Sequence, residues 1–200
     1  MKNFILLFSI VIFTFSVQCG VQVSTTSGNG CDFYTISSTA QLDSEVGINQ
    51  LPATTYARLA QSFQITTSDA QTVAGIKLRL QKTGSPSGSV EVKIESESSS
   101  FPSGTAVTGT ASINTTSIST TESYYTFTFP SQVILSTNTT YWVVVTGTYS
   151  QSSTDYVTWK GTTTSTLYTD GTSAVFQSGG GSYSTGTLED FGLQLVCGTS

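Results

Sequence analysis

Chemistry in this chain would have to come from carboxylates, hydroxyls, aromatic rings and three cysteines, because its 200 residues include no histidine. Without histidine there is no Ser-His-Asp or Cys-His relay and no histidine metal site. The twelve acidic residues are scattered over expected loops and outward strand positions, so no pair is placed for glycoside hydrolysis. We therefore expect no enzyme and no cofactor.

Aromatic residues gather in segment 148–183, which Ser, Thr and Gly interrupt more than other segments. Exposed Tyr or Trp on a loop of a rigid scaffold can stack on a sugar ring. Val157 and Trp159 share one strand parity, so a core position is the stronger interpretation for Trp159, and Trp142 is expected in the core outright. The candidate ligand-binding residues are Tyr149, Tyr156, Tyr168 and Trp159, and Tyr183 belongs to the same cluster.

Three acidic residues near the C-terminus form a weak candidate calcium site. Asp170, Glu189 and Asp190 could share an ion if folding brought them together. Calcium takes six to eight oxygen ligands, and the sequence does not show two such groups in register. Solvated acids are the competing interpretation.

Residues 1–18 predict a signal peptide. Lys2 precedes an apolar run over 4–15, which would span about 18 Å as a helix and is too short for the membrane core. Cys19 follows and resembles the lipidated cysteine of bacterial lipoproteins, although Ser16 and Gln18 depart from the usual motif around it. We expect an exported lipoprotein at the outer membrane or cell surface; ordinary cleavage and free secretion is the alternative.

The three cysteines are an odd number, which leaves one over in an exported chain. If Cys19 carries lipid, Cys31 and Cys197 remain as a pair near the two ends of the mature chain, in an oxidising environment. A disulfide between them would stabilise the fold by roughly 5 kcal/mol in the chain-entropy model. Two separate buried thiols are the alternative. Residues 19–30 are rich in Ser, Thr and Gly and predict a flexible tether.

From residue 31 onward apolar residues alternate with polar ones, as in half-buried strands. Segments 76–81 and 90–95 alternate with charged residues, and Gly84–Gly88 between them is a turn-forming cluster. If the two segments pair as a hairpin, Arg79 and Glu91 fall on one outer face.

Three further segments add to this pattern. Segment 124–129 alternates up to Pro130, which is expected to end it. Segment 141–145 is apolar on both parities, as in a central strand covered on both faces. The last strand, 191–197, places Cys197 on the inward parity.

About ten strand candidates and no amphipathic helix after residue 20 predict an all-β fold. We expect residues 31–200 to form a single jelly-roll-like β-sandwich whose terminal strands are joined by the disulfide.

The chain also resembles choice-of-anchor domains of exported bacterial surface proteins and phage-like appendages, over roughly residues 56–196. The motifs that carry the resemblance are Gln61-Ser62-Phe63, Ile76–Leu80, Gly84–Gly88, Val90-Glu91-Val92, Phe101–Thr105, Phe127-Thr128-Phe129, Leu135 and Thr140–Val145. The resemblance implies a jelly-roll-like sandwich displayed outside the cell, and it brings no catalytic residues with it.

These features together predict a surface-exposed binding or adhesion module of the bacterial envelope, with carbohydrate as a candidate ligand. The expected partners are a membrane, through the lipid at Cys19, and a glycan or a host or envelope surface protein. With 7 Lys and Arg against 12 Asp and Glu, the chain lacks the basic footprint of nucleic-acid binding. The alternative is a structural or assembly module of the envelope without a small-molecule ligand.

Overall fold

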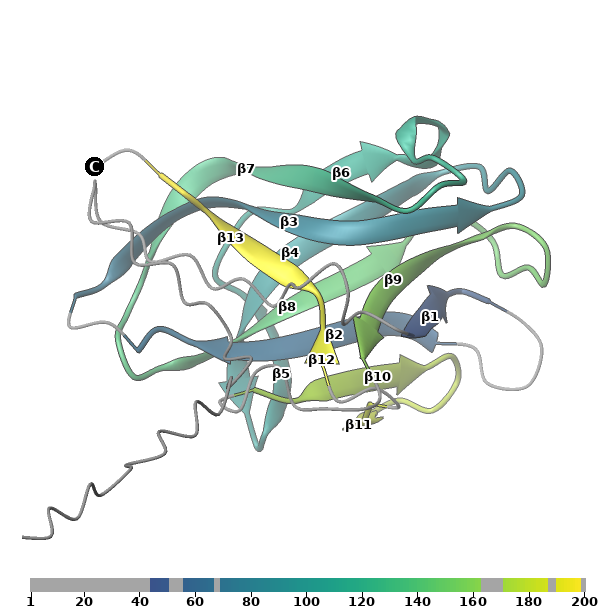
Figure 1. Cartoon of the computed structure of the whole chain (residues 1–200). Helices are drawn as coiled ribbons and strands as arrows, with labels where there is room; N and C mark the ends of the chain where they lie inside the picture. The colour runs from purple at the N-terminus through teal and green to yellow at the C-terminus, as the bar shows by residue number, and fades with distance from the viewer. Residues whose placement is uncertain (1–43, 51–55, 67–68, 163–170, 187–189, 199–200) are drawn as a thin grey trace, which may run out of the picture.

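The computed structural model describes residues 44–50, 56–66, 69–162, 171–186 and 190–198 (Figure 1). The strands in this part of the chain are β1 (Ser44–Ile48), β2 (Tyr56–Gln64), β3 (Gln71–Thr83), β4 (Ser89–Ser98), β5 (Phe101–Ala106), β6 (Ala111–Asn114), β7 (Ser123–Leu135), β8 (Thr140–Gly147), β9 (Tyr156–Thr162), β10 (Ser173–Gln177), β11 (Tyr183–Thr185), β12 (Asp190–Phe191) and β13 (Leu193–Cys197). The 3-10 turn η1 (Thr115–Ser117) precedes β7.

The predicted all-β fold is confirmed. Thirteen strands are present among the described residues rather than about ten, and the additional ones include the very short β6, β11 and β12. In the same part of the chain no helix is both long and apolar enough to cross a membrane.

The strands form one curled sheet whose main path runs β13-β3-β9-β1-β2-β8-β4-β5. Its middle is joined weakly, because β1 and β2 are linked by one parallel pair, Ile48 with Tyr56. On either side of that link the ladders are long and antiparallel. In Figure 1, β3 and β13 pass in front of β4 and β8, so the two halves of the path face each other.

The main core lies between these two halves, and it follows from strand alternation. Ile76, Leu78 and Leu80 of β3 and Val90, Val92 and Ile94 of β4 are fully buried in one cluster, while the residues between them point outward. β8 is buried on both faces, as its apolar sequence predicts: Val143 and Val145 join the main core, and Trp142 and Val144 join a second, smaller cluster on the outer face. Central strands covered on both sides need both parities apolar.

The hairpin considered for segments 76–81 and 90–95 does not form. β3 pairs with β7, β9 and β13, whereas β4 pairs with β5, β6 and β8. Gly84–Gly88 instead connects the two halves of the sheet, and Gly84 has a φ of 65° that suits glycine. Arg79 consequently pairs with Glu122 rather than facing Glu91.

Pro130 does not end its strand, because β7 continues to Leu135. Among the described residues β7 pairs only with β3, and the register shifts between Val73 and Gly75, so the segment around Pro130 leaves the ladder. Proline is tolerated at sheet edges and bulges, where its missing N–H is not needed. Gly75 permits the close strand approach at this bulge, since a Cβ there would lie 2.3 Å from the Phe127 carbonyl oxygen.

The expectations for the N-terminal region lie outside the described residues. These are the signal peptide at 1–18, the tether at 19–30, lipidation of Cys19 and the position of Cys31. Cys197 ends β13, is half-buried and pairs with Val73 of β3 across a register shift.

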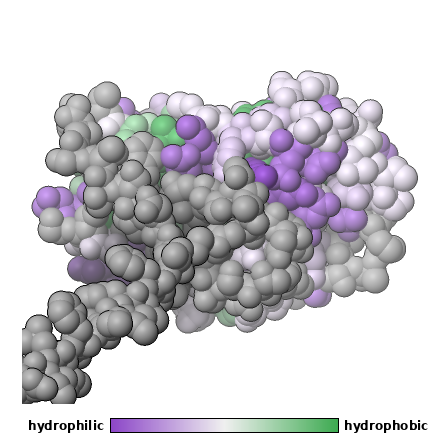
Figure 2. Space-filling view, viewed as in Figure 1, coloured by the Kyte–Doolittle hydropathy of each residue, from purple (hydrophilic) through white to green (hydrophobic). Residues whose placement is uncertain are grey.

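The described surface in Figure 2 is mostly white and purple, with small green areas. This agrees with outward strand positions occupied by Ser, Thr and charged residues. Among the described residues, the most exposed large apolar side chain is Ile134, at 70% exposure.

Candidate functional site

Two of the expected ligand-binding aromatics are buried. Trp159 is fully buried, its ring lies 4.4 Å from the Phe191 ring centroid to centroid, and its indole N–H donates to the Gly192 carbonyl at 2.7 Å. This confirms the core interpretation of Trp159 and removes it as a surface platform.

Tyr149 is also internal and is 4% exposed. Its hydroxyl donates to the Ile48 carbonyl and accepts from the Val157 N–H, both at 3.1 Å. Burial raises the pKa of this hydroxyl far above its usual value, and the bond from Val157 opposes the shift. The Tyr149 hydroxyl therefore links β1 and β9 as a neutral group and does not face a ligand.

Of the other two candidate aromatics, Tyr156 lies in the described part of the chain. Tyr156, at the start of β9, is half-buried and packs against the main core. Tyr168 lies outside the described residues.

Of the three candidate calcium ligands, Asp190 is the one that lies among the described residues. Asp190 is fully buried, and its Oδ1 accepts from the Gln61 amide at 3.2 Å. The same Gln61 accepts from the Phe191 N–H at 2.8 Å, so the two side chains fix the start of β12. Asp170 and Glu189 are outside the described residues, and no group of three possible metal ligands occurs within those residues.

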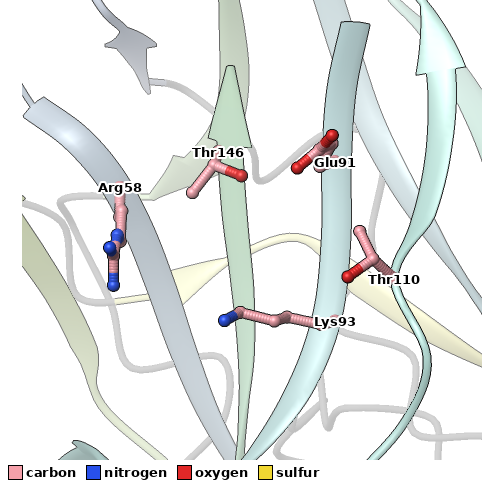
Figure 3. Close-up of a pocket in the computed structure, with 5 residues that line it drawn as sticks. All are labelled: Arg58, Glu91, Lys93, Thr110 and Thr146. Carbon is pink, nitrogen blue, oxygen red and sulfur yellow. The ribbon is translucent and has the colours of Figure 1, made fainter. Parts of the chain in front are cut away.

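A pocket lies elsewhere, on the outer face of strands β2, β8 and β4. Its lining side chains are Arg58, Glu91, Lys93, Thr110 and Thr146, and its volume is about 200 Å³. Figure 3 shows Thr146 between Arg58 and Glu91, with the Lys93 ammonium reaching across the next row toward β8. The arrangement follows from register, because Thr146 pairs with Arg58 on one side and with Glu91 on the other.

Arg58 is held by aromatic contacts on the side of β2 away from Thr146. Its guanidinium carbon lies 5.0 Å from the centroid of the Phe176 ring on β10, which is the cross-strand partner of Arg58. Tyr183 on β11 packs edge-on against Phe176, with centroids 5.2 Å apart. This stack positions the cation at one wall of the pocket.

Lys93 has a different partner. Its ammonium lies 2.7 Å from a carboxylate oxygen of Glu95, which is fully buried although it is on the outward parity of β4. The other Glu95 oxygen accepts from the Gly104 N–H at 2.7 Å. The carboxylate is therefore compensated by one cation and one backbone donor, as a buried charge requires.

Aromatic rings close one end of this outer face. Phe101 of β5 stacks on Trp142 and on Tyr183, with centroid distances of 6.5 and 6.4 Å. β5 and β11 thus meet over β8 from opposite edges of this half of the sheet. Beneath them Ala60 and Val144 form a small apolar cluster.

The Tyr183 hydroxyl is buried at this closed end. Burial raises its pKa to about 12; the negative charge of Glu95 adds to the shift, and Arg58 opposes it. Although Arg58 is close enough to lower that pKa, no hydrogen bond of ordinary geometry reaches the hydroxyl. The group remains protonated at neutral pH and keeps its capacity to donate.

The pocket brings together two cations, one carboxylate and two threonine hydroxyls. These groups can hold a small polar ligand by charge-assisted and neutral hydrogen bonds. The chain matches no protein-family model, no curated protein and no solved structure.

Proposed function

We propose that this chain is a surface-displayed binding or adhesion module of the bacterial envelope, exported and held by lipid at Cys19. The observation that carries the proposal is the outer-face pocket, in which Arg58 and Glu91 flank Thr146 beside a wall of aromatic rings. Rigid scaffolds with a few convergent polar groups in a concave site are typical of ligand-binding proteins. Carbohydrate remains a candidate ligand, since hydroxyl-rich molecules suit such a lining.

The scaffold that we propose is a jelly-roll-like β-sandwich, similar to choice-of-anchor domains. Its support is the single residue pair that joins the two halves of the curled sheet and the apolar core between them. A disulfide between Cys31 and Cys197, which we also propose, would link β13 to the start of the domain.

Binding can be tested on a glycan array and on immobilised matrix and envelope proteins. The exported chain with Cys19→Ser lacks the lipid acceptor and can be purified without detergent. We expect a bound ligand that is lost in Arg58→Met, which keeps the apolar stem and removes the charge. Lys77→Met is the matched control, since Lys77 lies on the outer side of β3, in the other half of the sheet. No binding to any probe by the folded chain would contradict the proposal, and recovery of envelope proteins without glycans would favour the assembly alternative.

Anchoring has a separate test. Metabolic labelling with a fatty-acid analogue should mark the wild-type chain and fail on Cys19→Ala. Labelling that survives the substitution would show that Cys19 is not the lipidated residue. Peptide mapping without reduction should recover Cys31 joined to Cys197, and free thiols at both positions would contradict the proposed disulfide.

A further inference from the structure

We propose that the outer-face pocket recognises a zwitterionic group, with Arg58 binding a carboxylate and Glu91 binding a protonated amine. The inference rests on the proposed binding function and adds the chemistry of the ligand. The group would be a short peptide with both ends free, such as a dipeptide, or an amino sugar that carries an acid. Both share one feature, a carboxylate and an ammonium a few bonds apart.

The first support is the placement of the two charges. Arg58, Thr146 and Glu91 form one row across β2, β8 and β4. Neighbouring strands are about 4.8 Å apart, so the backbones of Arg58 and Glu91 are separated by roughly 10 Å. An arginine side chain is long enough to approach a glutamate over that distance. Nevertheless, no ion pair joins them among the described residues.

The second support is that the aromatic wall explains why the two charges stay apart. The Arg58 guanidinium stacks on Phe176 of β10, the strand that flanks β2 on the side away from β8. Glu91 is half-buried and paired in the ladder with Ser112, which offers no positive charge. Thr146 lies between them in Figure 3, with its hydroxyl available for a hydrogen bond to the ligand.

The third support is the charge balance of the pocket. Lys93 is compensated by Glu95 at 2.7 Å. This leaves one cation, Arg58, and one anion, Glu91, to face the ligand. A simple anion would be attracted by Arg58 but repelled by Glu91. A simple cation would be attracted by Glu91 but repelled by Arg58, so in each case the repulsion offsets part of the binding free energy. Only a ligand with both charges is complementary to the pair.

The volume of the pocket limits the ligand to a small group. About 200 Å³ is below the roughly 300–1,000 Å³ of sites that enclose drug-sized molecules. A dipeptide or one sugar unit therefore fits better than an extended chain, in which the two charged groups would lie too far apart.

The test uses the exported Cys19→Ser chain and two matched pairs of probes. Binding of each probe is measured by titration of the amide chemical shifts. Muramic acid is compared with N-acetylmuramic acid, and alanyl-alanine with N-acetyl-alanyl-alanine. Within each pair, acetylation replaces the charged amine by a neutral amide and leaves the carboxylate in place. We expect millimolar binding of one or both zwitterions, with shifts at β2, β4 and β8. Acetylation should weaken it by about tenfold or more, as expected for losing one charged hydrogen bond. The probe pair that shows this loss of affinity tells whether the zwitterionic group comes from a peptide or from an amino sugar.

Two variants assign the roles. Glu91→Gln should bring the affinity ratio between amine and acetylated probe close to one, whereas Arg58→Gln should weaken both members of a pair. Glu97→Gln, an exposed acid on the same strand, is the control and should keep the ratio. Thermal unfolding verifies that each variant is folded.

Equal affinity for the amine and its acetylated partner, or a ratio unchanged by Glu91→Gln, would overturn this inference. If glycans or proteins still bind the chain in an Arg58-dependent way, the proposed function survives without it. If the folded chain binds neither these probes nor any array ligand, both proposals fail.

Discussion

Lys93 and Glu95 stand two residues apart on the outer face of β4 and form an ion pair of 2.7 Å, in which the carboxylate is fully buried and the lysine is partly exposed. The asymmetry matters because the two charges lose different amounts of hydration on folding. Lysine can still reach water when its partner is removed, whereas Glu95 cannot.

We therefore predict that Lys93→Met destabilises the fold more than Glu95→Gln does. Removing one partner of a buried pair costs about 3–5 kcal/mol when the charge that remains is buried, and Lys93→Met leaves such a charge. Glu95→Gln keeps an oxygen that can accept from the Gly104 N–H. Urea unfolding of both single variants and of the double variant measures the coupling. Equal and additive losses would show that the pair does not act as a unit.

Much of the fold could be predicted from alternation alone. The apolar parity of β3 and β4 gave the core residues, and the two-sided apolar run of β8 gave its central position. The partners of these strands could not be predicted, because alternation specifies a face and not a neighbour. The Gly84–Gly88 turn reads equally well as a hairpin and as a crossing between the halves of the sheet.

The candidate site was harder to predict, since its residues are ordinary outward positions of four separate segments. Arg58 and Thr146 carry no local signal, and Glu91 read as a solvated charge. Their meeting depends on the register of β2, β8 and β4, in which Thr146 lies 55 residues from Glu91 and 88 residues from Arg58 in sequence. Glu95 pairs with Trp142 of β8, a strand that is apolar on both faces, but only the register shows this pairing.

Trp159 tests the assignment of the aromatics to the core. Trp159→Ala should lower the free energy of unfolding by about 3–5 kcal/mol, because it removes a fully buried ring and its stack on Phe191. Tyr124→Ala is the comparison, since Tyr124 is 38% exposed, and its loss should cost less than about 1 kcal/mol. Denaturant unfolding measures both. A small effect at Trp159 would contradict its core position.

Tyr149 tests the link between β1 and β9. Tyr149→Phe keeps the ring and removes a hydroxyl that satisfies the Ile48 carbonyl and the Val157 N–H. Leaving buried backbone groups without partners costs about 1–3 kcal/mol each, so we expect a loss in that range or above it. Hydrogen exchange should also quicken at Val157 relative to the β4–β8 ladder. An unchanged exchange rate at Val157 would mean that water replaces the hydroxyl.

Asp155 should give the fold an acid-sensitive contact at the Gly84–Gly88 crossing. Its carboxylate accepts from the Ser85 N–H at 2.7 Å and from the Thr154 hydroxyl at 2.7 Å, and these bonds, led by that from Ser85, hold its pKa below the usual value. A lowered pKa in the folded state means that the contribution is present above the unfolded pKa and is lost as pH falls through the folded one.

Asp155→Asn should therefore lower the thermal midpoint at neutral pH and flatten its decline in acid, so that variant and wild type converge at the lowest pH. Thr154→Val removes one donor to the charged form, which raises the folded pKa and should move the acid decline to higher pH. Thermal unfolding between roughly pH 2 and 7 separates these outcomes. Parallel curves for wild type and Asp155→Asn would show that the carboxylate charge does not hold the crossing in place.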